Sequence, residues 1–273
     1  RSYGKAAERF ASVGGTEGLV RALLGRAAVE RDQGALDKAL GHYLECERIL
    51  SDSDDPDAQA GLLRGKGEVY VRLGRLDDAV AAFSGAAAQY SEIGDAGSAN
   101  IAELSLGGLL QQKGRHDEAM EVFKEVILRS ARTGQADIQA HAHLGLGKAC
   151  QALGEALGAI HHYETAVALL ESIGNGDKAI RTNREVGRML IARGDFNKAY
   201  QRLKAADLGK QTDDVVDALV GTAQLAWACL KSDRFDEGMG LIERLLASST
   251  LSHVIDDELA EAFQGIGQRL RRQ

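Results

Sequence analysis

The sequence predicts an all-α solenoid built from antiparallel helix pairs. A glycine-led segment returns at a fixed spacing, with its glycine at positions 34, 74, 114, 154 and 194, 40 residues apart each time. A sixth copy opens with Asp233 in place of glycine, and its Phe235 follows Phe196 by 39 residues. Self-similarity at such a period is typical of repeat architectures. The chain also contains a single proline, Pro56, and only 5% aromatic residues, which favours helix over a β-sandwich.

Each repeat is expected to form a helical hairpin, a helix A followed by a helix B. The glycine ends helix A, and an Asp in the following turn favours the start of helix B. A small residue in the middle of helix A and a large one in the middle of helix B recur in step, which indicates a close crossing of the two helices. The small residues are Ala27, Gly67, Gly107, Gly147, Gly187 and Ala226, and the large ones are Tyr43, Phe83, Phe123, Tyr163 and Leu203.

These recurring positions predict where each helix lies along the chain. The A helices are predicted at 18–33, 56–73, 96–113, 136–153, 176–193 and 213–231, and the B helices at 36–51, 76–92, 116–132, 156–172, 196–208 and 235–248. The whole chain, 1–273, is expected to be one array. It divides into a half-repeat at 1–15 with helix B only, full repeats at 16–55, 56–95, 96–135, 136–175, 176–212 and 213–251, and a terminal capping helix at 252–273. Since the chain opens on Arg1 inside a repeat, we expect it to be a fragment of a longer protein.

The composition of the chain argues against some classes of binding partner. The net charge of −7 argues against nucleic acid or an anionic membrane as the main ligand. No apolar run approaches the roughly 18 residues of a membrane span, so no membrane insertion is expected. Cys46, Cys150 and Cys229 are odd in number and far apart, which predicts buried free thiols and a reducing, cytoplasmic location.

The recurring columns resemble the tetratricopeptide repeat, in a long form of about 40 residues similar to that of Pins, kinesin light chain, rapsyn or bacterial peptide-sensing regulators. The period exceeds the usual 34 residues, and the proline that commonly closes each unit is missing. The resemblance implies a right-handed superhelix whose concave wall, lined by A helices, holds an extended peptide or a partner's helix. It implies a non-enzymatic scaffold or adaptor, without naming the partner.

The predicted concave wall carries a basic stripe. Arg181, Arg184 and Arg188 are spaced i, i+3, i+7 and so share one helical face, with Lys148 and His141 expected on the neighbouring A helix. Guanidinium groups suit carboxylates or phosphates through paired hydrogen bonds. The alternative is a solvated charged face that pairs with its own Glu185. Earlier repeats offer a mixed wall: Leu24, Ala28, Arg31, Arg64, Glu68, Arg72, Leu104, Gly108 and Gln111, with Arg64 and Arg72 the expected contacts.

Trp227, the single tryptophan, follows the small residue Ala226 and is expected either to anchor a partner in the groove or to pack in the core near the terminal helix. No spacing supports a metal site, a P-loop or a Ser-His-Asp arrangement, so no catalytic residue, metal or cofactor is predicted. The predicted function is binding of an extended or helical peptide segment that carries acidic groups. The alternatives are self-assembly as a homo-oligomer through open end repeats, or a peptide-sensing regulatory domain.

Overall fold

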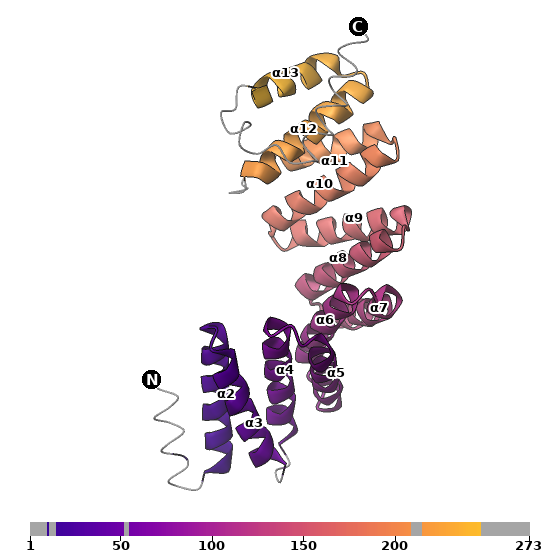
Figure 1. The fold of residues 1–273 in the computed structure, drawn as a ribbon. Helices are drawn as coiled ribbons and strands as arrows, with labels where there is room; N and C mark the ends of the chain where they lie inside the picture. The colour runs from indigo at the N-terminus through magenta and orange to yellow at the C-terminus, as the bar shows by residue number, and fades with distance from the viewer. Residues whose placement is uncertain (1–9, 11–14, 52–54, 209–214, 247–273) are drawn as a thin grey trace. The chain divides into compact units, whose positions relative to one another are not determined.

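The computed structural model describes residues 10, 15–51, 55–208 and 215–246, and these residues form α-helices and turns without a β-strand (Figure 1). The chain falls into two compact units, Arg1–Leu153 and Gly154–Gln273. The all-α prediction is confirmed for the described residues. Apart from Phe10 and Gly15, the predicted half-repeat at 1–15 and the capping helix at 252–273 lie outside them.

In both units, A-type and B-type helices alternate and each packs on the next along the chain (Figure 1). The A helices of the first unit are α2 (Thr16–Asp32), α4 (Pro56–Arg72), α6 (Ala96–Gln112) and α8 (Ala136–Ala152), and its B helices are α3 (Leu36–Leu50), α5 (Leu76–Glu92) and α7 (His116–Thr133). The second unit holds B helices α9 (Ala156–Ser172), α11 (Phe196–Leu208) and α13 (Phe235–Leu246), and A helices α10 (Gly176–Ala192) and α12 (Val215–Lys231). The predicted ranges differ from these bounds by no more than one or two residues.

The recurring glycines end helices as predicted, because their backbone adopts a left-handed conformation. Their φ angles lie between 69° and 81° at Gly34, Gly74, Gly94, Gly114, Gly134, Gly154, Gly174 and Gly194. At Gly74 the turn closes with Arg75 N–H donating to the Tyr70 carbonyl at 2.9 Å. In the sixth copy Asp233 occupies the same place with φ 63°, so the loss of the glycine did not change the turn.

The crossing of helices depends on glycines that face large side chains. The Phe123 ring of α7 lies against Gly107 of α6 and Gly145 of α8, and a Cβ atom at Gly107 would come within 2.6 Å of that ring. Gly65 of α4 gives the same clearance to Tyr43 of α3. A ring on helix B is therefore held between its own A helix and the next one, as close packing of small and large residues requires.

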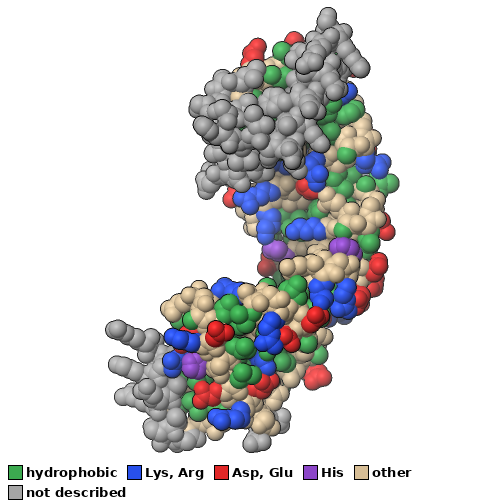
Figure 2. Space-filling model, in the orientation of Figure 1, with side chains coloured by type: hydrophobic (Ala, Val, Ile, Leu, Met, Phe, Trp, Pro, Cys, Tyr) green, Lys and Arg blue, Asp and Glu red, His purple; other side chains and the backbone are tan. Residues whose placement is uncertain are grey.

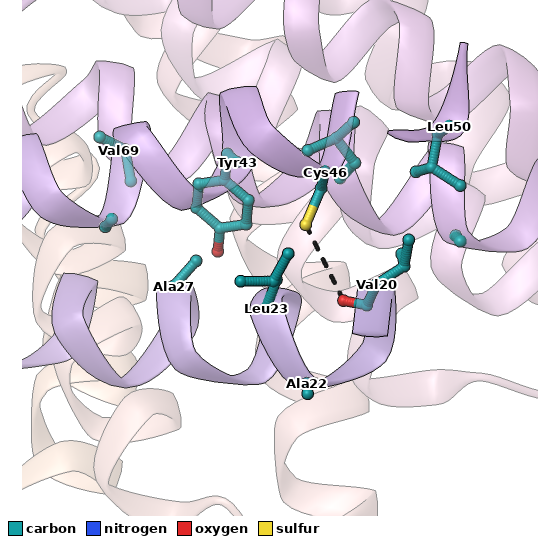
Figure 3. Packing of buried hydrophobic residues seen from close by; sticks show 11 residues of the cluster. Val20, Ala22, Leu23, Ala27, Tyr43, Cys46, Leu50 and Val69 are labelled. Atoms are coloured by element: carbon teal, nitrogen blue, oxygen red, sulfur yellow. Dashed lines mark hydrogen bonds between the residues drawn. The ribbon is translucent and has the colours of Figure 1, made fainter. Parts of the chain in front are cut away.

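The first hairpin shows how this core is filled (Figure 3). Tyr43 and Cys46 of α3 face Leu23 and Ala27 of α2, and all four side chains are buried. Burial raises the pKa of the Cys46 thiol to about 12 and that of Cys229 to about 11. All three cysteines are buried thiols outside any disulfide bond, as predicted.

Candidate partner-binding surface

The A helices of the first unit form a wall that contains a pocket of about 430 Å³, called here the α2–α4–α6 pocket. Its lining consists of Arg31, Asp32, Glu68, Val71, Arg72, Phe83, Ser105, Gly108 and Leu109. The C-terminal turns of α2 and α4 supply the charged residues, whereas α5 and α6 supply the apolar floor through Phe83 and Leu109. In Figure 2 this unit shows basic, acidic and apolar side chains interspersed on one face rather than a patch of one sign.

An ion-pair network fixes the charged edge of this pocket. Arg31 pairs with Glu68 of α4 and, through Nη2, with Asp32 at 2.8 Å. Arg64, predicted as a contact residue, lies one turn before Glu68, and its Nη1 is 3.7 Å from that carboxylate. The Arg31 guanidinium is thus largely neutralised by two carboxylates from two helices.

Arg72, the other predicted contact in this unit, is exposed at the pocket edge. Its Nη1 donates to the Arg31 carbonyl at 2.6 Å, and the same carbonyl oxygen also accepts from the Gly34 N–H at 3.0 Å. Together with the ion pair between Arg31 and Glu68, this hydrogen bond links α4 to α2 and holds the Arg72 guanidinium beside the pocket.

His141 and Lys148 are both exposed and lie two turns apart on α8, so they share one helix face. The His141 ring Nδ1 is 2.8 Å from the Asp137 carbonyl. Because α8 belongs to the first unit and the arginine stripe to the second, the expected approach of Lys148 to that stripe stays a prediction.

The three predicted arginines of α10 have different surroundings. Arg181 is exposed, whereas Arg184 and Arg188 are half-buried. Arg184 reaches across Gly221 of α12, where a Cβ atom would come within 2.6 Å of its Nε. Arg188 forms a two-point ion pair with Glu185, with Nη2–Oε1 at 2.5 Å and Nε–Oε2 at 3.1 Å. The pairing weighed as the alternative therefore exists, and Arg181 is the most accessible cation of the stripe.

Trp227 on α12 is half-buried, which lies between the two predicted placements. The Lys231 ammonium lies 4.6 Å from its ring centroid and 5.9 Å from the ring of Phe196 on α11. Such a distance is a cation–π contact. One part of the indole thus packs within the hairpin stack and another part stays accessible.

Sequence reasoning missed the pocket itself. It placed Arg31, Glu68, Arg72 and Gly108 on the wall, but not Phe83, which it assigned to the core of the second hairpin. The ring is indeed buried, yet one part of it lines the pocket. No sequence signal distinguishes a core ring with an accessible part from one without.

Within the described ranges, no group of three or more His, Cys, Asp and Glu side chains is placed to hold a metal ion. None of the helices described is long and apolar enough to cross a membrane.

Stacked hairpins of a helix A and a helix B, with a glycine at the end of helix A, define a helical repeat protein. Proteins of this architecture use the surface of such a stack for binding. Residues 58–127 and 98–172 match the family model of the tetratricopeptide repeat. Residues 58–172 of this protein thus contain tetratricopeptide repeats, with a period of 40 residues. No curated protein matches its sequence significantly.

Solved structures confirm the fold at low sequence identity. The tetratricopeptide repeat sensor protein PH0952 of Pyrococcus horikoshii, a signal transduction ATPase with numerous domains, is 16% identical with a TM-score of 0.75 over 94% of this chain and 43% of its own. RapI in its apo form is 16% identical with a TM-score of 0.71, covering 89% of this chain and 68% of its own. The kinesin light chain-type repeats of Podosopora anserina are 19% identical with a TM-score of 0.57, covering 73% and 98%.

Proposed function

We propose that this protein is a non-enzymatic, intracellular adaptor that binds an extended or helical acidic segment of another protein along its A helices. The observation that carries the proposal is the basic stripe of α10, with Arg181 exposed and Arg188 half-buried on one face. Basic groups gathered on one face of an otherwise acidic chain provide the electrostatic complementarity that orients an acidic partner and speeds its association.

The ion pair between Arg188 and Glu185 is compatible with this role. A guanidinium has five N–H donors, and the pair with Glu185 uses Nε and Nη2. A partner carboxylate that joins or replaces Glu185 gains a charge-assisted hydrogen bond. Because the helices are already packed, the protein itself loses little conformational entropy when a segment binds.

The test compares partner binding by the wild-type chain and by Arg181→Glu/Arg188→Glu. Arg184 is left intact because it packs across Gly221 of α12, so its loss would disturb the repeat stack. The control is Arg48→Glu/Arg132→Glu, which changes the net charge equally at two exposed positions on the B helices α3 and α7. Partners captured from cell extract are identified by mass spectrometry, and their segments are titrated as labelled peptides.

We expect the α10 variant to lose at least tenfold in affinity, since two charge-assisted hydrogen bonds contribute roughly 1.5–3 kcal/mol each and tenfold is about 1.4 kcal/mol. The control should retain binding, and affinity for the wild type should fall as salt rises. Equal binding by both variants would remove α10 from the proposed surface. A size that grows with concentration, without any captured partner, would favour self-assembly instead.

A second candidate function is peptide sensing within a larger regulator. The similarity to PH0952, whose tetratricopeptide repeats are described as a sensor, favours it. In a sensor, ligand binding shifts a conformational equilibrium and so controls another part of the protein. Hydrogen exchange that changes in helices without ligand contact would support this function, and protection limited to contacted helices would support the adaptor.

A further inference from the structure

We propose that the α2–α4–α6 pocket receives one apolar side chain of the bound segment, of the size of leucine, methionine or phenylalanine. The residue of the segment next to it is acidic, and its carboxylate pairs with Arg72. This inference rests on the proposed function, because it assumes that the segment runs along the A helices. The recognition element that it describes lies entirely within the first unit.

Gly108 is the first observation behind the proposal. It lies inside α6, where glycine costs up to about 1 kcal/mol relative to alanine. Packing explains its neighbour Gly107, whose Cβ atom would strike Phe123, but a Cβ atom at Gly108 would meet nothing within 4 Å. Gly108 lines the pocket, so its missing side chain leaves space that other residues at this position would fill.

The floor of the pocket is the second observation. Phe83 is 3% and Leu109 5% exposed, and both contribute to the lining. Beside them Val71 keeps 39% of its surface exposed, although it is a large aliphatic residue. An apolar side chain placed over these three residues would remove apolar surface from water, which contributes about 25 cal/mol per Å².

The charged edge is the third observation, and it indicates which residue stands beside the apolar one. Arg31 is neutralised by Glu68 and Asp32. Among the residues that the structure describes, Arg72 forms one hydrogen bond, from Nη1 to the Arg31 carbonyl, which leaves Nε and Nη2 as donors for a ligand. A carboxylate of the ligand, adjacent to the buried side chain, would accept hydrogen bonds from these two donors in a bidentate arrangement.

A peptide fits this site better than a small molecule. The volume of about 430 Å³ lies within the range of small-molecule sites, which bury most of their ligand's surface. Here, however, Asp32, Val71, Arg72 and Gly108 are all exposed, so the site is open along the A-helix wall. Such a shallow site suits one side chain of a segment that continues along the wall.

The pocket is tested by filling it. Gly108→Met places a Cβ atom where no other atom lies within 4 Å, and it raises helix propensity. Gly41→Met is the matched control, because Gly41 is also an exposed helical glycine with nothing within 4 Å of a Cβ atom, but it does not line the pocket. Arg72→Gln tests the charged edge. The probe is a phage-displayed library of random 12-residue peptides, followed by titration of the selected peptides.

We expect the wild type and Gly41→Met to select peptides with an apolar residue next to Asp or Glu. Gly108→Met should bind those peptides at least tenfold more weakly, and Arg72→Gln should bind them several-fold more weakly and lose the preference for the acidic neighbour. Thermal unfolding of Gly108→Met at or above the wild-type temperature excludes misfolding as the cause.

Other outcomes separate this inference from the proposed function. Peptides that bind Gly108→Met as well as wild type, yet lose affinity for Arg181→Glu/Arg188→Glu, overturn the pocket and leave the acidic-segment adaptor intact. Peptides that are insensitive to both changes overturn both. Failure to select any peptide, with thermal stabilisation by small apolar compounds instead, overturns the peptide assignment in favour of a small ligand.

Discussion

Glycine is required by the backbone conformation at some positions of this chain and is unfavourable to the helix at others. At Gly74 the backbone is left-handed, with φ 71°, and a Cβ atom would meet no neighbour, so only the backbone conformation opposes a larger residue. At Gly41 the backbone is helical and the Cβ site is equally open. The two positions therefore isolate the effect of conformation from that of packing.

We expect Gly74→Ala to destabilise the protein by about 1–2 kcal/mol, because L-residues are strained in the left-handed region. Gly41→Ala should stabilise it by up to about 1 kcal/mol, because alanine is the better helix former. Urea unfolding of both variants beside the wild type measures the difference. Equal signs for the two substitutions would contradict this account.

The difference between adjacent Gly107 and Gly108 shows where residue-level prediction stops. The 40-residue recurrence of a small residue identifies Gly107 as a packing position, and the structure confirms it against Phe123. No small residue recurs at the positions equivalent to Gly108. The pocket that Gly108 lines also contains Phe83, Val71 and Arg31, which come from three other helices. Sequence spacing does not show which side chains from distant repeats meet around one point.

At the scale of the helix, three of the A helices, α4, α6 and α10, start on side-chain caps that the turn sequences supply, whereas the N-cap residues of α2 and α8 form no such hydrogen bond. Asp55, Asp95 and Asn175 accept a hydrogen bond from the backbone N–H three residues on, at 3.0, 3.0 and 3.4 Å. The helix bounds were predictable almost to the residue because the turn glycines recur at a fixed spacing and adopt a left-handed backbone at the helix ends.

Hydrogen bonds from Ser98 hold the pKa of Asp95 below its usual value. A depressed folded pKa means that the ionised cap stabilises the protein above the unfolded pKa of about 4 and that this stability is lost as pH falls through the folded pKa. We expect Asp95→Ala to cost about 1 kcal/mol at pH 7 and clearly less at pH 3. Asp95→Asn, which keeps the cap without the charge, should show a smaller loss at pH 7 and little dependence on pH. Denaturant unfolding at both pH values measures this, and a cost for Asp95→Ala that does not change with pH would refute it.

At the scale of the whole molecule, contacts run mainly between consecutive helices within each unit. In such arrays stability is roughly a sum of repeat and nearest-neighbour terms, so damage stays local. The repeat period alone was enough to predict this organisation. It was not enough to predict the division into two units near residue 153, because the columns continue across that position without interruption.

Phe123→Ala removes the ring held between α6 and α8 and should cost about 3–5 kcal/mol locally. We expect hydrogen exchange to accelerate in α6, α7 and α8, while α10 and α11 keep their wild-type rates. Leu203→Ala, at the equivalent position of α11, should produce the complementary pattern in the second unit. Faster exchange throughout the chain in either variant would show that the units open as one.

The position of the Phe123 ring between two A helices also determines where a shortened fragment of the protein should end. A fragment that stops at Thr133, after a complete hairpin, leaves the side of the ring toward Gly145 uncovered. One that continues to Ala152 covers it with α8. The smallest piece that covers such a ring on both sides is therefore three helices, A–B–A, and a truncation series should end on A helices rather than at hairpin boundaries.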